Sequence, residues 1–183
     1  MPHDGKRWFH IILSTRGSWL PGDVRGFRSR DHRIHSSGDY KHKPPAGEHE
    51  GLHAHHMQRS RGAVLIPAPL RPIIGTALLR KVIEQGHQIL ALSSGITHAH
   101  LQVELPNDLA EARQLAGTWK QASSHAIRNV LPGSVWAGGG KPIPIKDRPH
   151  HQNVFDYILG HVDEGAWVWS FRDPLPWEGV DET

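Results

Sequence analysis

The sequence predicts an α+β fold, with one antiparallel sheet and helices packed on it. Stretches rich in β-branched and aromatic residues, which suit strands, alternate with stretches whose apolar residues recur at helical spacing. The composition, 183 residues of which 37% are hydrophobic and 21% charged, suits one folded domain, because a single domain spans about 100 to 200 residues.

The first three predicted strands come from the N-terminal segment and from a hairpin. Residues 8–15, WFHIILST, predict the first strand. Apolar residues then recur at three-and-four spacing from Pro67 to a stop near Gly86, which predicts a helix. Residues 87–93 and 97–105 follow as two strands joined by a short turn.

The remaining predicted elements complete a recognisable order. A second amphipathic helix covers 109–130, with Asn107 or Asp108 placed to cap it. A fourth strand at 143–146 has neighbouring prolines that confine it to a sheet edge. A third helix follows over roughly 150–165. The order predicts the split βαβ pattern of a ferredoxin-like sheet, with helices on one face and an appended C-terminal helix.

The positive charge of the chain is concentrated in one insertion. Residues 16–62 have turn residues near their ends and no sustained period, which predicts a long loop with room for one short helix. This segment carries a net charge of +4, whereas the rest of the chain carries −1. Such a segment suits contact with a polyanion, although a solvated loop has the same composition. We expect a single domain over 1–168 that carries this insertion, and a C-terminal tail at 169–183.

The composition also restricts the location and the chemistry. The chain contains no cysteine, which excludes a disulfide scaffold and thiolate metal sites. Its apolar runs are too short to span a bilayer, and its N-terminus lacks the apolar region of a secretory signal. We therefore expect a cytoplasmic protein with no membrane partner.

The strand predicted at 97–105, THAHLQVEL, places two imidazoles on one face of the sheet. Side chains alternate along a strand, so the apolar residues face one side and the polar side carries His98, His100 and Gln102. Two rings at positions i and i+2 of a rigid strand can converge on one cation. Two surface histidines in a chain that contains 16 would give the same pattern.

The third helix carries a tyrosine on its polar side. Its predicted apolar face consists of Phe155, Ile158, Leu159 and Val162. The other stripe consists of His150, Asn153, Tyr157 and His161. Tyr157 and His161 are neighbours one turn apart, and the only other tyrosine, Tyr40, lies in the insertion. A tyrosine beside a metal ligand is a candidate nucleophile, and a ring packed where helix meets sheet is the alternative.

Together these features resemble the HUH single-tyrosine transposases, which include those of the 200/605 class of insertion sequences and the REP-associated tyrosine transposases. Three segments carry the resemblance, which covers most of the chain: the first strand with the residues that follow it, WFHIILSTRGSWLPGD, the HAH element at 98–100 and the YILGH motif at 157–161. It implies cation ligands at His98, His100 and His161 and a nucleophile at Tyr157.

The resemblance also implies an activity and partners. The expected enzyme is a metal-dependent transposase that nicks and rejoins single-stranded DNA, at hairpin-forming element ends, through a 5'-phosphotyrosine. The family commonly has Gln or Asn four residues after the tyrosine, where this chain has His161. The expected cofactor is Mg²⁺ or Mn²⁺, and a three-imidazole site favours Mn²⁺. Relatives of the 200/605 class form dimers, whereas REP-associated relatives can act as monomers, so a homodimer is the favoured of the two expected assemblies.

Basic and aromatic loop residues are candidate DNA contacts. Lys and Arg position phosphates, and an exposed Trp stacks on an unpaired base. Trp8 and Trp119 lie on predicted apolar faces and are expected in the core, whereas Trp19 and Trp136 lie in loops. The candidate DNA-binding residues are Arg16, Arg25, Arg28, Arg30, Arg33, Lys41, Lys43, Trp136 and Lys141.

Two other functions fit parts of the sequence. The segment HAHLQV at 98–103 also resembles the motif of histidine-triad nucleotidyl transferases, in which His100 would be the nucleophile. That motif usually closes its domain, whereas about 80 residues follow it here. The third reading is a non-catalytic nucleic-acid-binding module on a ferredoxin-like sheet. Such a sheet normally exposes aromatic residues, and this one is expected to expose His, Gln and Glu104.

Overall fold

The structure, a computed structural model, describes residues 2–20, 22–23, 47–59 and 62–178. The chain divides into two compact units, one formed by 1–14 together with 66–183 and the other by 15–65. The elements in chain order are β1 (Lys6–Ser14), α1 (Glu50–Arg59), η1 (Ala68–Leu70), α2 (Arg71–Glu84), β2 (Gln88–Ser94), β3 (His98–Pro106), α3 (Leu109–Ala126), β4 (Lys141–Pro144), α4 (Arg148–Gly160), η2 (His161–Glu164) and β5 (Trp167–Ser170).

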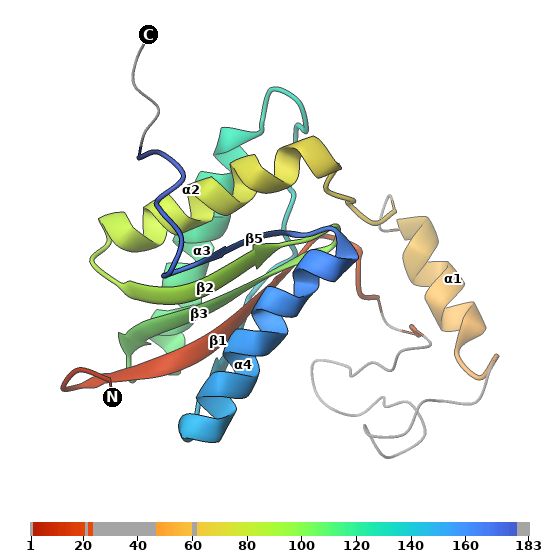
Figure 1. The fold of residues 1–183 in the computed structure, drawn as a ribbon. Helices are drawn as coiled ribbons and strands as arrows, with labels where there is room; N and C mark the ends of the chain where they lie inside the picture. Colours follow the sequence, from red (N-terminus) through yellow and green to blue (C-terminus); the bar gives the residue numbers. More distant parts are fainter. Residues whose placement is uncertain (1, 21, 24–46, 60–61, 179–183) are drawn as a thin grey trace, which may run out of the picture. The chain divides into compact units, whose positions relative to one another are not determined.

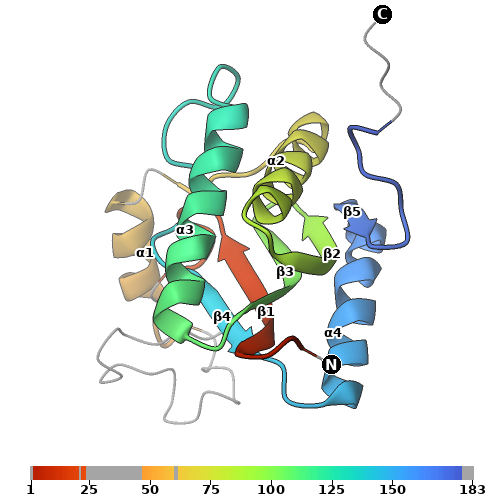
Figure 2. The same ribbon diagram turned by 90° about the vertical axis from the view of Figure 1, so that its left-hand side faces the viewer.

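The larger unit is built on one five-stranded sheet. Its strand order is β4-β1-β3-β2-β5, and every neighbouring pair is antiparallel. The sequence β1, α2, β2, β3, α3, β4 is the split βαβ pattern, so the predicted α+β class is confirmed. Helices α2 and α3 cover one face of the sheet, and α4, the predicted appended helix, lies on the opposite face (Figures 1 and 2).

The main apolar core lies between the sheet and the helices α2 and α3. Side chains alternate along β1 and β3, so one set of them faces this side of the sheet. Each Å² of apolar surface that they bury stabilises the fold by about 25 cal/mol. Trp119 of α3 is fully buried there, as predicted. The buried strand residues are Phe9, Ile11, Leu13, Ala99, Leu101, Val103 and Leu105.

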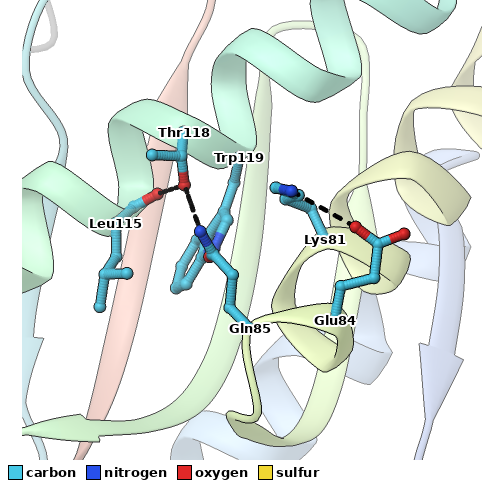
Figure 3. Close-up of polar contacts among 6 residues, drawn as sticks. All are labelled: Lys81, Glu84, Gln85, Leu115, Thr118 and Trp119. Carbon is cyan, nitrogen blue, oxygen red and sulfur yellow. Dashed lines mark hydrogen bonds and ion pairs between the residues drawn. The ribbon is translucent and has the colours of Figure 1, made fainter.

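A glutamine at the end of α2 links the two helices of this layer (Figure 3). The Gln85 side-chain amide donates to the Thr118 hydroxyl at 3.1 Å, and its carbonyl accepts from the Trp119 indole N–H at 2.6 Å. A buried indole N–H without an acceptor would destabilise the fold. Gln85 therefore satisfies the one polar atom that Trp119 carries into the core.

Aspartates begin the two long helices that follow the hairpin. Asp108 caps α3 by accepting from the Ala110 and Glu111 N–H groups at 2.6 and 2.9 Å, which selects Asp108 over Asn107. Asp147 caps α4 by accepting from the His150 N–H at 2.8 Å. Helix α4 thus begins two residues before the predicted start of the third helix.

The end of the third helix differs from the prediction. The α-helix ends at Gly160, and a 3₁₀ turn, η2, continues to Glu164. Gly165 ends this turn with a left-handed φ of 75°. A 3₁₀ turn has about three residues per turn instead of 3.6, so its side chains rotate away from the stripe of α4. Val162, expected on the apolar face, is consequently 59% exposed, whereas His161 is buried.

The sheet has two short edge strands. Strand β4 lies at one edge, as its prolines predicted, although it is shifted toward Lys141 relative to the predicted 143–146. Strand β5 at the other edge was not predicted, and the tail expected at 169–183 begins inside it. Four residues are too few to show an alternating pattern that separates a strand from a loop.

The smaller unit contains α1, in the stretch where the sequence predicted a loop with room for one short helix. The Val64 N–H donates to the Arg16 carbonyl at 2.8 Å, which joins the two ends of the described part of this unit. Across the described ranges of both units, no helix combines the length and the apolar character that crossing a membrane requires.

Candidate active site

Three histidines from two distant segments meet on the α4 face of the sheet. His98 and His100 belong to β3, and His161 is the first residue of η2. One ring nitrogen from each lies within 4.8 Å of the others. The rings of His100 and His161 are stacked with their centroids 4.6 Å apart, and the His98 centroid lies 4.7 Å from that of His100. The structure thus brings together the three histidines that the resemblance singles out.

The strand register and the course of α4 produce this meeting. His98 pairs with Ser14 and His100 with Ile12 in the antiparallel ladder, so β3 holds both imidazoles on the face opposite the main core. Helix α4 lies on this face, and its C-terminal end delivers His161 to the start of β3. A pocket of about 200 Å³ borders His98 and His161 and leaves room beside the rings.

Two ring nitrogens of the cluster have no partner in the described part of the protein. Nε2 of His100 and Nε2 of His161 are buried and have no hydrogen-bond partner. Most buried polar atoms in proteins have one, so two such nitrogens at one place suit the role of cation ligands. The opposite nitrogens are engaged. His100 Nδ1 lies 2.8 Å from His10 Nε2, and His161 Nδ1 lies 3.3 Å from a Glu164 carboxylate oxygen.

Burial keeps the imidazoles of His100 and of its partner His10 neutral. Burial, and to a smaller extent the neighbouring histidines His10, His98 and His161, lowers the pKa of His100 to about 2. Burial likewise lowers the pKa of His10 to about 4, with smaller contributions from His150, His161 and Lys141. A neutral imidazole keeps a lone pair on one nitrogen, which is the state that binds a cation.

Tyr157 lies beside this cluster, one helical turn before His161. Its ring centroid is 4.7 Å from that of His161 and 5.2 Å from that of His100. The side chain is 52% exposed, so an incoming group can reach it. Burial, followed by the charge of Glu164, raises the pKa of the Tyr157 hydroxyl. The phenol is therefore neutral at neutral pH and needs help to act as a nucleophile.

A basic pocket lies at the start of α4. Its volume is about 690 Å³, and its charged rim includes Arg7, Lys146 and Arg148. None of these three side chains forms an ion pair within the described part of the chain. Tyr157 follows nine residues after Arg148 on α4, a rise of about 14 Å along the helix axis. The other residues that line the pocket are Pro2, Trp8, Ile145, Asp147 and His151.

The candidate DNA contacts fall into three groups. Arg16 and Lys141 are exposed. Trp136 is only 5% exposed, and its indole N–H donates to the Ser123 hydroxyl at 2.9 Å. The ring of Trp136 is therefore packed in the interior and offers no face to an unpaired base. The residues outside the described ranges are Arg25, Arg28, Arg30, Arg33, Lys41 and Lys43.

His10 belongs to the site and was not singled out from the sequence. The alternation in WFHIILS puts Trp8, His10 and Ile12 on one face of the first strand. That pattern was visible, but it does not show which strand lies beside His10 or in which register. The register pairs His10 with Gln102, two residues along β3 from His100, and this brings the two rings together.

The geometry disfavours both alternative functions. His100 is 3% exposed and stacked on His161, so an incoming nucleotide cannot reach it as a nucleophile. The polar sheet face is covered rather than open, because Gln102 and Glu104 are fully buried. Gln102 donates from its amide to the His151 carbonyl of α4 at 2.9 Å. A nucleic acid therefore has no exposed sheet surface to bind along this part of β3.

The chain has a structural neighbour among the solved proteins. No family model matches the chain, and no curated protein matches it. The solved structures include a REP-associated tyrosine transposase bound to a REP hairpin, which this chain resembles with a TM-score of 0.46 and 13% sequence identity. The match covers 87% of this chain and 68% of that one. At this identity the likeness concerns the fold alone, and the roles of side chains follow from their own geometry.

Proposed function

We propose that this protein is a DNA-nicking and DNA-joining transposase of the HUH single-tyrosine type. Tyr157 is the nucleophile, and His98, His100 and His161 hold a divalent cation. One observation carries the proposal: a half-exposed tyrosine lies against two of three converging imidazoles, His100 and His161, each of which has a buried nitrogen without a partner. A cation site next to a reactive hydroxyl is the combination that metal-assisted phosphoryl transfer needs.

Tyr157 performs the bond exchange. Its hydroxyl oxygen attacks the scissile phosphorus, the phosphorus–O3' bond breaks, and the phenol proton is balanced by the proton that the leaving 3'-oxygen takes up. The product is a 5'-phosphotyrosine and a free 3'-hydroxyl. The pKa of phenol, about 10, makes the tyrosyl oxygen a good leaving group. A 3'-hydroxyl can therefore reverse the reaction on the same or another strand without ATP.

The imidazoles supply the cation site and its orientation. When bound there, a divalent cation draws charge from a phosphate oxygen and orients the phosphate. Three nitrogen ligands suit Mn²⁺ better than Mg²⁺, which prefers oxygen ligands and retains water. We therefore propose Mn²⁺ as the better cofactor in vitro, with Mg²⁺ as the competing one. The neutral state of His100, whose pKa is lowered, keeps its lone pair available at neutral pH.

Single-stranded DNA is the proposed substrate, presented at hairpin-forming element ends. His100 and His161 are buried where α4 ends on the sheet, and we propose that the scissile phosphate reaches them with its flanking bases unpaired. The basic rim at the start of α4 suits the phosphates of the same strand. Because Tyr157 and the three histidines adjoin in one chain, we propose that each chain has a complete site, whether or not it dimerises.

A covalent-adduct assay tests the proposal. The full chain is incubated with Mn²⁺ and labelled single strands from the flanks of its gene, and the products are separated on a denaturing gel. The expected result is a protein–DNA band that EDTA prevents and that Tyr157→Phe removes, because the phenyl ring has no oxygen to form the phosphate ester.

The chain offers a matched control, since it has only one other tyrosine, Tyr40. Tyr40→Phe removes the same atom from a residue outside the described ranges and is expected to leave the band unchanged. A band that persists in Tyr157→Phe contradicts the assignment of the nucleophile. Tight binding of every flank with no band in the unmodified protein contradicts the catalytic function as a whole.

A further inference from the structure

The imidazole of His100 lies at the centre of the proposed cation site and depends on one distant side chain. It is 3% exposed, and its Nδ1 lies 2.8 Å from Nε2 of His10. Its Nε2 is buried without a partner. His10 is itself 7% exposed on β1, so both ends of this hydrogen bond are shielded from water.

The position of the shared proton decides whether His100 can be a ligand. A neutral imidazole has one N–H and one lone pair. If the proton sits on His100 Nδ1, it is donated to His10 Nε2, and the His100 Nε2 lone pair faces the cluster. If the proton sits on Nε2, the site contains a buried N–H with no acceptor. The first arrangement satisfies the hydrogen bond and leaves no buried donor without an acceptor.

The other two clustered histidines have partners of a different kind. His98 Nδ1 lies 3.1 Å from the hydroxyl of its neighbour Thr97, and His161 Nδ1 lies 3.3 Å from Glu164, whose side chain is 69% exposed. Both of these contacts are only partly buried, unlike the contact of His100 with His10. The contact between His10 and His100 is the shortest of the three and is buried, so water has no access to replace it.

We propose that His10 is a positioning residue of the cation site. It accepts the Nδ1–H of His100 and so holds the His100 ring in the orientation and tautomer that direct the Nε2 lone pair at the cation. His10 binds neither the cation nor the substrate. Partners of this kind, when removed, typically weaken metal binding by about 10-fold to 100-fold. The inference rests on the proposed function, because it assigns a role toward the same cation.

Two substitutions separate positioning from packing. His10→Phe keeps an aromatic ring but removes the acceptor, and His10→Gln supplies an amide oxygen near the place of Nε2. Titration calorimetry of the full chain with Mn²⁺ measures the Kd of each variant, and circular dichroism checks that each is folded. We expect His10→Phe to raise the Kd by about 10-fold to 100-fold and His10→Gln to restore most of the affinity.

A measurement on the unmodified protein does not depend on any variant. Long-range ¹H–¹⁵N correlation spectra distinguish Nδ1–H from Nε2–H imidazoles, and we expect His100 to be the Nδ1–H form without metal. An Nε2–H form overturns the inference, as does a folded His10→Phe variant that binds Mn²⁺ as tightly as the unmodified chain. The proposed function survives both of these results. If instead the unmodified chain binds no Mn²⁺, the proposed cation site fails, and His10 loses the role inferred for it.

Discussion

At the scale of single residues, the site depends on which nitrogen of each imidazole is occupied. The Nδ1 atoms of His98, His100 and His161 each lie near a protein partner. For His100 and His161 the Nε2 atom is left without one. Since an imidazole binds a cation through a nitrogen that carries no proton, an Nδ1–H that is donated to its partner would leave Nε2 as the ligand atom of the proposed cation site.

A second buried group on the same strand depends on the N-terminal segment. Glu104 is fully buried, and its carboxylate accepts from the His3 backbone N–H and from the His3 ring N–H, both at 2.7 Å. Burial raises the pKa of the Glu104 carboxyl, but the hydrogen bonds from His3 outweigh burial and hold the pKa below its usual value. The ionised carboxylate therefore stabilises the folded state.

The sign of the pKa shift gives a pH dependence. Because the folded pKa of Glu104 is lower than the unfolded one, this contribution is complete above the unfolded value of about 4.3 and is lost as the pH falls through the folded value. We expect Glu104→Gln to lower the free energy of unfolding by about 1 to 3 kcal/mol at pH 7, and by progressively less below pH 4. Urea unfolding of both proteins at pH 7 and pH 3 measures the difference.

Glu111→Gln is the matched control, because it removes the same charge from the exposed first turn of α3. It should change the free energy of unfolding by less than about 0.5 kcal/mol. If Glu104→Gln lowers the free energy of unfolding by the same amount at pH 7 and at pH 3, the loss comes from poor packing of the amide and not from the missing charge.

At the scale of elements, α2 approaches the edge strand β5 through a glycine. A Cβ atom on Gly75 would overlap the indole ring of Trp167. Gly75→Ala therefore forces either the helix or the tryptophan to move, and we expect it to lower the free energy of unfolding by about 1 to 3 kcal/mol. Denaturant unfolding followed by circular dichroism measures this loss.

Another glycine provides the comparison. Gly117 lies within α3, and a Cβ atom there would meet no other atom within 4 Å. Gly117→Ala should raise the free energy of unfolding by about 0.5 to 1 kcal/mol, because alanine favours the helix over glycine. If both alanines stabilise the protein, the close packing of α2 on Trp167 is contradicted.

The elements differ in how far the sequence could predict them. Helices α2 and α3 have long apolar periods, and β3 has a clean alternation, so their existence and the faces they bury followed from spacing alone. Strand β5 is too short for that signal. The 3₁₀ turn at His161 could not be predicted for another reason. The residues of such a turn are also compatible with an α-helix, so the sequence does not show where the helical pitch changes.

The site was predictable to the extent that its residues are close in sequence. His98 and His100 are two apart on one strand, and Tyr157 and His161 are one turn apart on one helix, so each pair could be expected to share a face. That the two pairs meet was an expectation from resemblance. The contact of His10 with His100 depends on the register of β1 against β3, which no local pattern encodes.

At the scale of the whole larger unit, one face of the sheet forms the main core and the other carries the candidate site. The face under α2 and α3 buries the main core, while the face under α4 carries the clustered histidines, Tyr157 and the basic pocket. The separation leaves the main core intact when the site is altered. Substitutions in the basic pocket should therefore change DNA binding with little effect on stability.

The basic pocket leads to a prediction about salt. Arg148→Ala should weaken binding of single-stranded DNA several-fold and reduce the slope of log affinity against log salt by about 0.7, the value for one lost phosphate contact on a single strand. Fluorescence anisotropy at several salt concentrations measures both quantities. Arg113→Ala on α3 removes the same charge from the opposite side of the sheet and should alter neither. Equal effects of the two substitutions would mean that net charge alone attracts the DNA.

The prolines of β4 limit how the sheet can grow. The Ile145 N–H donates inward to the Trp8 carbonyl at 2.9 Å, and backbone N–H groups alternate in direction along a strand. The outward positions of β4 are therefore those of Pro142 and Pro144, which have no N–H to offer. An unpaired strand edge is a template for aggregation, and one without donors is a poor template. Two copies of this protein therefore have few hydrogen bonds with which to join their sheets into a fibril along β4, even at high concentration.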